Sequence, residues 1–207
     1  MPDMKKTYLY RMTHIMNIPH VLSHGITHRN SPNANPDFIP IGDKGLITKR
    51  DNFILDNGKR LGEYIPFYFG IRTPMLYVVQ KGYNLVTPTS PENIVYCVSS
   101  VQNIIENNHD FIFTDGHAFN SLSTQYYPKD IPNIDNIIDK NATMAIYWNS
   151  DNDLDRKRKK DAEFLVLGDI NISAIIGYYV FNENAKNILT GLGISETYIR
   201  VKSEYYF

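Results

Sequence analysis

The sequence is poor in cysteine and in long uninterrupted hydrophobic runs. Its one cysteine, Cys97, excludes an intramolecular disulfide and most cysteine-rich zinc sites. No segment approaches the roughly 18 consecutive apolar residues that a transmembrane helix needs. The stretch from Met1 to Lys6 has no apolar core of the kind found in a signal peptide. We therefore expect a soluble, cytoplasmic protein.

The sequence also has little net charge. Its 21 basic and 22 acidic side chains give a formal charge of −1, so any nucleic-acid binding must come from a local patch. In contrast, 15 tyrosines and 10 phenylalanines are a high aromatic content, and aromatic rings fill cores but also stack on bases and on nicotinamide. The 207 residues, 43% of them hydrophobic, fit one domain spanning 1–207 with a sizeable core.

Short apolar runs separated by turn residues predict many strands and few long helices. The expected strands are Thr7–Met12, Tyr64–Gly70, Ile94–Ser99, Asp110–Thr114, Glu163–Leu167, Ile175–Phe181 and Tyr198–Lys202. The expected helices are one between a cap at Asn17 and Gly25, a turn within Gly42–Asp51, and helices over Ser100–Asn107 and Glu183–Leu192. Periodicity leaves Thr73–Gly82 and Ala142–Trp148 open between helix and strand. Because helices and strands do not alternate regularly, we expect an α+β fold with mostly antiparallel or mixed sheets.

A run of five basic residues, Arg156 to Lys160, leads almost directly into Glu163 at the start of an apolar strand. The run is typical of a solvated charged loop, since three aspartates precede it and can pair with it. A mobile basic loop that attracts phosphate and delivers a glutamate to a site would have the same pattern. The sequence leaves both interpretations open.

Three other patterns are weaker. His20, His24 and His28 have the four-residue spacing of metal ligands on a helix, but Gly25 is expected to end that helix before His28. The polar stretch 114–117 follows a strand, where either a site or a plain turn can lie. Arg50 could hold a pyrophosphate or a carboxylate through paired hydrogen bonds.

Five blocks of the sequence, taken in order, resemble the DarT family of DNA ADP-ribosyltransferase toxins. Each block alone is a weak signal, but their order is specific and they extend to about residue 167. They are Tyr10–His20 closed by Gly25, Asn35–Asp43 with Arg50, Tyr64–Gly70 continuing through Arg72–Tyr77, Phe113–His117, and Ala162–Val166.

The resemblance implies the ADP-ribosyltransferase fold, in which two packed sheets with short helices surround a central NAD⁺ cleft. NAD⁺ would be consumed as co-substrate without a metal, and its ADP-ribose would pass to a base in single-stranded DNA. In the branch that this sequence is most similar to, that base is thymine. The resemblance also implies a toxin paired with a macrodomain antitoxin that removes the mark, and we expect a monomer.

The resemblance assigns roles to particular residues. Glu163 matches the catalytic glutamate, and a carboxylate can stabilise the positive charge that builds on the ribose as the glycosidic bond breaks. Arg50 matches an essential arginine at the cofactor and acceptor base, where a positioning and charge-stabilising role suits a side chain that is always protonated. The other candidates are Thr13, His14, Ile15, Gly25, Tyr68 and Phe69 at NAD⁺, and Tyr64, Arg72, Met75, His117 and Arg156 at the DNA.

Three rival functions compete with this one. A metal-dependent nuclease would use the histidines with Asp115 and His117, but Glu163 lacks a lysine two places on, as in the common nuclease Glu-x-Lys pattern. A non-catalytic nucleic-acid-binding module would be basic throughout, against the net charge of −1. A transferase of the same fold that modifies RNA or protein remains compatible with the sequence.

Overall fold

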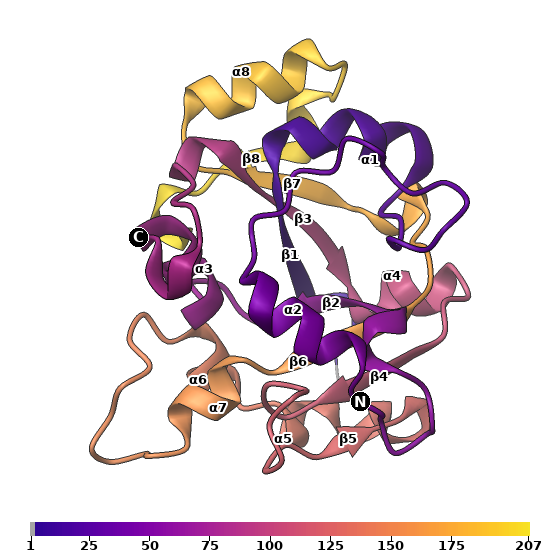
Figure 1. Ribbon diagram of the computed structural model, residues 1–207, viewed down its shortest axis with the longest axis vertical. Helices are drawn as coiled ribbons and strands as arrows, with labels where there is room; N and C mark the ends of the chain where they lie inside the picture. Colours follow the sequence, from indigo (N-terminus) through magenta and orange to yellow (C-terminus); the bar gives the residue numbers. More distant parts are fainter. Residues whose placement is uncertain (1–2) are drawn as a thin grey trace.

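Short runs of apolar and aromatic residues form the strands of one mixed sheet. The computed structural model describes residues 3–207, and its eight-stranded sheet has the order β5-β4-β6-β2-β1-β3-β7-β8 (Figure 1). All neighbouring strands are antiparallel except β7 and β8. The strands are β1 (Tyr8–His14), β2 (Tyr64–Tyr68), β3 (Ile94–Ser100), β4 (Phe111–Thr114), β5 (Gln125–Tyr126), β6 (Glu163–Leu167), β7 (Gly177–Val180) and β8 (Ile199–Val201).

The sheet is almost divided at its centre. β1 and β2 share one register pair, Tyr10 with Tyr68, whereas β1 and β3 share seven pairs and β2 and β6 share five. Tyr68 is also the register partner of Glu163. The two packed sheets that we expected are therefore two four-stranded halves of one sheet, joined by a narrow junction. The α+β class and the mostly antiparallel pairing are confirmed.

Short helices cover the sheet (Figure 1). They are α1 (Ile18–His24), α2 (Lys44–Asp51), α3 (Pro74–Lys81), α4 (Val101–Glu106), α5 (Ile134–Ile137), α6 (Lys140–Met144), α7 (Arg156–Lys160) and α8 (Glu183–Gly191). Every residue of β3 is buried because both faces of the strand are covered. Ile94, Tyr96 and Val98 pack into one core cluster, and Val95 and Cys97 pack into another, as the two-residue period of a strand requires.

Two expectations fail locally. The segment Ala142–Trp148 is neither one strand nor one helix, because α6 ends at Met144 and residues 145–150 form neither. The basic run is the short helix α7 rather than a loop. The strand β5 was not predicted, since two residues are too few to show a period. Within residues 3–207, no helix has the length and apolar character needed to cross a membrane.

The last residues of the chain complete one side of the core. Tyr206 is 2% exposed, and the single proton of its hydroxyl is shared between the carbonyls of Ile94 and Tyr179, at 3.0 Å and 3.1 Å. The guanidinium of Arg72 donates to the carbonyl of Tyr206 and lies 4.2 Å from the ring centroid of Phe207. The C-terminal segment therefore braces the turn between β2 and α3.

Candidate active site

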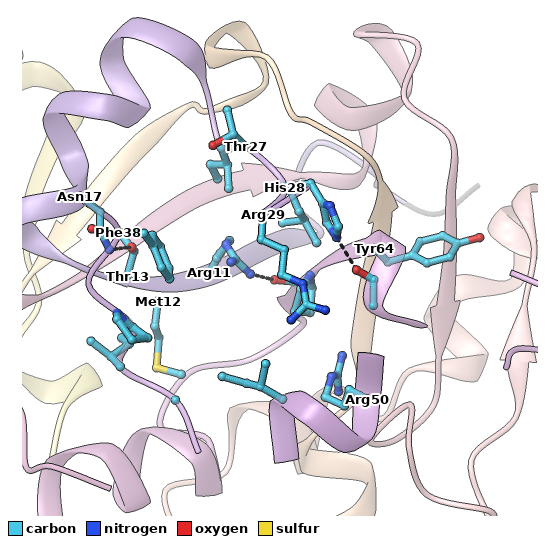
Figure 2. Close-up of a pocket in the computed structure, with 18 of the residues that line it drawn as sticks. Arg11, Met12, Thr13, Asn17, Thr27, His28, Arg29, Phe38, Arg50 and Tyr64 are labelled. Carbon is cyan, nitrogen blue, oxygen red and sulfur yellow. Dashed lines mark hydrogen bonds between the residues drawn. The ribbon is translucent and has the colours of Figure 1, made fainter. Parts of the chain in front are cut away.

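A cavity of about 370 Å³ opens where the two half-sheets diverge (Figure 2). Its walls come from β1, α1, the loop 26–43, α2, β2, α3 and Cys97 of β3. Two of the sequence-predicted sites meet here, because the NAD⁺ candidates and the DNA candidates both contribute side chains to the lining. The predicted residues in this lining are Thr13, Gly25, Arg50, Tyr64, Tyr68, Met75 and His117.

Asn17 fastens the loop that covers this cavity (Figure 2). Its side-chain amide donates to the Ile39 carbonyl at 2.9 Å and to the Thr13 hydroxyl at 3.1 Å, and its side-chain oxygen accepts from the Ile39 amide at 2.9 Å. Asn17 occupies the expected N-cap position of α1, but its side chain makes no capping hydrogen bond. The residue predicted as a helix cap is instead a clamp between β1 and the loop.

Glu163 begins β6 with a fully buried side chain. Arg50, in the last turn of α2, donates to its two carboxylate oxygens at 2.9 Å and 2.7 Å, and the amide of Ala118 donates to Oε1 at 3.1 Å. Burial by itself raises the pKa of Glu163, but the charge of Arg50 outweighs it and holds that pKa below its ordinary value. Glu163 is therefore ionised at neutral pH before any ligand binds.

His117 completes this group. Its Nε2 lies 3.7 Å from Glu163 Oε1 and 3.5 Å from an Arg50 nitrogen, while its Nδ1 accepts a hydrogen bond from the amide of Phe119 at 3.2 Å. Burial lowers the pKa of His117, so the ring is neutral near pH 7. Because Nδ1 is an acceptor, we infer that the single ring proton is on Nε2, facing Glu163.

Arg11 is a pocket residue that the sequence reasoning missed. Its guanidinium donates to the carbonyl of Pro66 at 2.9 Å, and it makes no ion pair with any residue from 3 to 207. Burial lowers the pKa of Arg11, because no carboxylate offsets the lost hydration. A desolvated guanidinium without a counter-ion favours an anionic ligand. The alternation of side chains along β1, which puts Arg11 on the face of Thr13, could have identified it.

Three residues predicted at NAD⁺ lie outside the cavity lining. Ile15 is 3% exposed and packs in the core, and Phe69 packs edge-on against Phe164 there. His14 is half-buried, and its Nδ1 accepts from the backbone amide of Met16, which starts the turn leading into α1. Their predicted contacts with NAD⁺ remain predictions.

Gly25 does line the cavity, but the structure gives it a further reason to be glycine. Its φ is +77°, and a Cβ there would meet the carbonyl oxygen of Ile170 at 2.1 Å. Any other residue would be strained and would also collide with that backbone. The requirement for glycine therefore comes first from packing between α1 and the segment after β6.

Two residues predicted at DNA are also outside the lining. Arg72 is turned toward the C-terminal segment, where Tyr206 and Phe207 engage its guanidinium. Arg156 starts α7, and neither it nor the exposed Lys157 forms an ion pair within the described part of the chain. These two cations remain available to a phosphate, whereas Arg72 is occupied.

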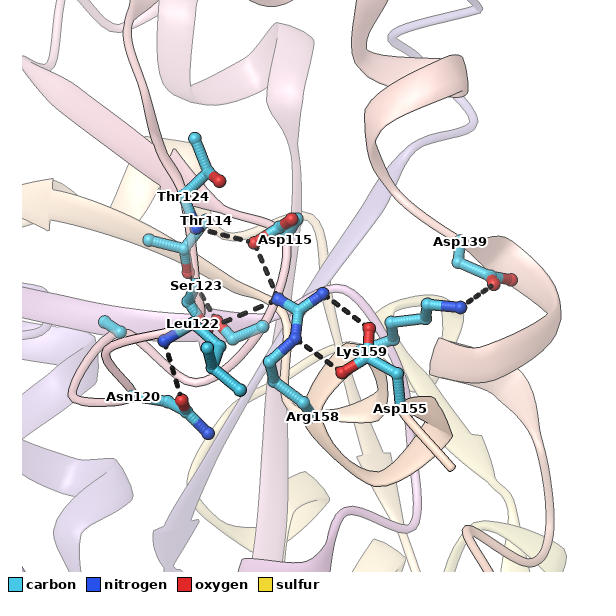
Figure 3. Close-up of polar contacts among 12 residues, drawn as sticks. Thr114, Asp115, Asn120, Leu122, Ser123, Thr124, Asp139, Asp155, Arg158 and Lys159 are labelled. Atoms are coloured by element: carbon cyan, nitrogen blue, oxygen red, sulfur yellow. Dashed lines mark hydrogen bonds and ion pairs between the residues drawn. The ribbon is translucent and has the colours of Figure 1, made fainter. Parts of the chain in front are cut away.

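Most of the basic run is used inside the protein (Figure 3). Arg158 donates to both carboxylate oxygens of Asp155 at 2.7 Å and to Asp115 at 2.8 Å. Lys159 pairs with Asp153 at 3.2 Å. The contact with Asp115 joins α7 to the loop after β4. The basic run that was expected to attract phosphate therefore serves in large part to hold these two segments together.

Lys160 is the most buried member of the run. Its side chain is 0% exposed, and its ammonium donates to the carbonyls of Ile71 and Thr143 at 2.9 Å each. Burial lowers the pKa of Lys160 to about 8. The residue fixes the segment that enters β6 and cannot reach a ligand from this position.

The histidine series is not brought together. The rings of His20 and His24 stack at 4.5 Å, but His28 points elsewhere and contacts the carbonyl of Gly62. Across residues 3–207, no group of three His, Cys, Asp or Glu side chains is arranged to hold a metal ion.

Comparison with known proteins gives one consistent family. Residues 10–207 match the model described as "ssDNA thymidine ADP-ribosyltransferase, DarT". A DNA ADP-ribosyl transferase of Escherichia coli O127:H6 is 31% identical, covering 88% of this chain and 84% of that protein. A DNA ADP-ribosyl transferase of Thermus sp. is 33% identical over 79% of this chain and 78% of that one. A DNA ADP-ribosyl transferase–DNA ADP-ribosyl glycohydrolase fusion protein of Thermosipho africanus is 31% identical, and the match covers 87% of this chain and 44% of the fusion.

Solved structures agree with the sequence comparison. Thermus sp. 2.9 DarT in complex with ADP-ribosylated ssDNA superposes with a TM-score of 0.80 and 27% identity, covering 100% of this chain and 98% of that one. The same protein in complex with NAD⁺ gives a TM-score of 0.77 and 25% identity, covering 100% and 99%.

Proposed function

This chain belongs to the DarT family, described as ssDNA thymidine ADP-ribosyltransferases, and on that premise we propose that it transfers ADP-ribose from NAD⁺ to thymine in single-stranded DNA. The observation that carries the proposal is the ionised, fully buried Glu163, held by Arg50 beside a cavity between two half-sheets. Fixed negative charge in such a place stabilises the cationic ribose that forms when nicotinamide leaves.

The cavity suits NAD⁺ in charge as well as in position. Arg11 supplies a partly buried cation that pairs with no carboxylate among residues 3–207, which fits the pyrophosphate of a dinucleotide. Thr13, Gly25 and Tyr68 line the same space, where we place the rest of the NAD⁺ molecule. Glu163 and Arg50 are the residues to which we assign catalysis, Glu163 by stabilising charge and Arg50 by orienting Glu163 and the reacting groups.

We place the acceptor strand along Tyr64, Met75 and His117, which line the same cavity. Arg156 and Lys157 supply the free cations that hold its phosphates. A base must leave its stack to reach the cavity, which favours single-stranded DNA over duplex.

The Thermosipho fusion joins a transferase to a DNA ADP-ribosyl glycohydrolase. By analogy, we propose that this chain is the toxin of a toxin–antitoxin pair whose macrodomain antitoxin removes the mark. It acts as a monomer in the cytoplasm, with residues 1–207 forming a single ADP-ribosyltransferase domain.

Labelled NAD⁺ incubated with single-stranded DNA, duplex DNA, RNA and protein tests this function. We expect label on thymine-containing single strands, loss of label with Glu163→Ala, and full activity with the matched control Glu106→Ala on the exposed face of α4. Label on RNA or protein alone would keep the fold and change the acceptor. Metal-dependent strand cleavage without label would refute the transferase.

A further inference from the structure

The segment 28–31, near the start of the loop between α1 and α2, contributes to one wall of the cavity. His28 and Arg29 line the cavity, and Figure 2 shows both side chains on the side that faces Tyr64 and Arg50. Our inference rests on the proposed function, in which NAD⁺ occupies this cavity. The position of this wall then affects how well the dinucleotide binds.

Two side chains connect the segment to the opposite side of the cavity. Arg29 pairs with Asp51, the last residue of α2, at 2.5 Å, and the ring of His28 contacts the carbonyl of Gly62. The side chain of Arg29 is 57% exposed, and an ion pair that close to solvent contributes little by itself. These contacts close the wall, but a stronger attachment is needed to fix its position.

Asp169 provides that attachment from the other side of the segment. Its carboxylate accepts a hydrogen bond from the His28 backbone amide at 2.6 Å through Oδ1 and one from the Ser31 hydroxyl at 2.5 Å through Oδ2. Hydrogen bonds to an ionised carboxylate are short and roughly twice as strong as neutral ones. One side chain therefore holds both ends of the segment 28–31, with Arg29 between them.

The position of Asp169 is itself set by β6. Asp169 lies two residues after Leu167, the last residue of that strand, and the next residue, Ile170, exchanges two backbone hydrogen bonds of 2.9 Å with Ile26. Glu163 begins the same strand. The strand thus carries the buried glutamate at one end and the attachment of the cavity wall just beyond the other, which fixes the two relative to each other.

We propose that Asp169 is a positioning residue for NAD⁺, which holds the segment 28–31 where His28 and Arg29 complete the wall of the cavity. Asp169 does not line the cavity and acts only through this segment. A wall that is already in place needs less ordering when the ligand binds. The carboxylate therefore increases the affinity for NAD⁺ and leaves the chemical step unchanged.

The loop stays attached to the protein without the Asp169 side chain. The backbone bridge between Ile26 and Ile170 does not involve that side chain, and Asn17 fastens the far end of the loop at Ile39. Asp169→Ala should therefore fold, and only the part of the loop between these two attachments should gain freedom. Hydrogen exchange of the free protein should become faster in peptides covering residues 28–36 and stay unchanged in β3.

NAD⁺ binding and kinetics test the consequence for function. In Asp169→Ala we expect Kd and KM for NAD⁺ to rise by about 10-fold or more, because the wall is in place for a smaller fraction of the time. The kcat at saturating NAD⁺ and the affinity for single-stranded DNA should not change, since binding is lost equally in the ground state and the transition state.

Two further variants separate positioning from other effects of the substitution. Asp169→Asn should keep most of the NAD⁺ affinity, because its amide oxygen can accept from His28 and its amide nitrogen can donate to the Ser31 hydroxyl. Asp37→Ala, at an exposed aspartate of the same loop, is the matched control and should behave as wild type.

Removing the partner hydroxyl completes the test. Ser31→Ala should raise the Kd for NAD⁺ by a smaller factor, and combining it with Asp169→Ala should weaken binding no further than Asp169→Ala alone, because both changes remove the same contact. An unchanged Kd in Asp169→Ala, additive losses, or equal losses of NAD⁺ and DNA affinity would overturn the inference and leave the proposed function intact. If the wild type neither binds NAD⁺ nor modifies DNA, the proposed function itself fails.

Discussion

Replacing Arg50 tests the buried ion pair on which the site depends. Glu163 is 0% exposed and Arg50 is 14% exposed, so Arg50→Met leaves a carboxylate in the interior without its cation. Removing one partner of a buried pair costs about 3–5 kcal/mol. Since folded domains are stable by about 5–15 kcal/mol, the loss is a large part of the free energy of unfolding.

Two further variants test whether the loss of stability comes from the unpaired charge of Glu163. Arg50→Ala opens the cavity so that water reaches Glu163, and its loss should be nearer the lower limit of about 3 kcal/mol. Combining Arg50→Met with Glu163→Gln removes both charges and should recover most of the stability, although the protein is inactive. Urea unfolding followed by circular dichroism measures all four proteins.

The contribution of Glu163 to the free energy of unfolding changes with pH in opposite directions in the wild type and in Arg50→Met. In the wild type the pKa of Glu163 is below the ordinary 4.5, so its stabilisation is present above that value and is lost as the pH falls through the folded-state pKa. In Arg50→Met the charge of Arg50 is gone, and burial, the largest influence, raises that pKa against His117 and the Ala118 amide, so the penalty is full at neutral pH and is relieved as the pH falls. A loss below about 1 kcal/mol at pH 7, or an equal loss at pH 7 and pH 5, would refute the reasoning.

Three other predictions follow from single contacts. Arg11→Met should weaken NAD⁺ binding by roughly 10-fold to 100-fold in calorimetry and leave DNA affinity unchanged, because we place only the pyrophosphate of NAD⁺ at Arg11; parallel losses would contradict this. Neutralising Arg156 and Lys157 together should reduce the slope of log affinity for single-stranded DNA against log salt by about 1.4, whereas Arg158→Gln, which breaks the contact between α7 and Asp115, should lower the unfolding midpoint instead. Lys160 has a folded-state pKa of about 8 against an ordinary 10.5, so the unfolded chain binds its proton more tightly and stability should rise with pH between those values. Lys160→Met should lack that rise in urea unfolding, and an unchanged rise would show that other groups cause it.

Local patterns were enough to predict most elements. Short apolar runs located β3 and β6, and Gly25 marked the end of α1. The position of Glu163 at the start of an apolar strand could be predicted in the same way, because neighbouring residues determine where a strand begins. Its pairing with Arg50 was not, because it joins residues 113 positions apart.

The basic run shows why the remainder was out of reach. Composition alone made Arg158 and Lys159 look available to phosphate, yet their partners include Asp115, which lies 43 residues away on a different loop. Arg72 was assigned to DNA from the family resemblance, and its partner lies 134 residues away. Long-range ion pairs and hydrogen bonds determine which cations are free, and local sequence patterns do not predict these contacts.

The buried position of Tyr206 has a consequence for how the enzyme is made. Its hydroxyl joins β3 to β7, and its carbonyl holds Arg72 next to the α3 turn that contributes Met75 to the cavity. A ribosome releases the chain N-terminus first, so this side of the core stays open until residue 206 has left the exit tunnel. The nascent chain therefore has no finished cavity until Tyr206 has emerged, and a chain cut before that residue would keep its full set of catalytic residues without the wall that positions them.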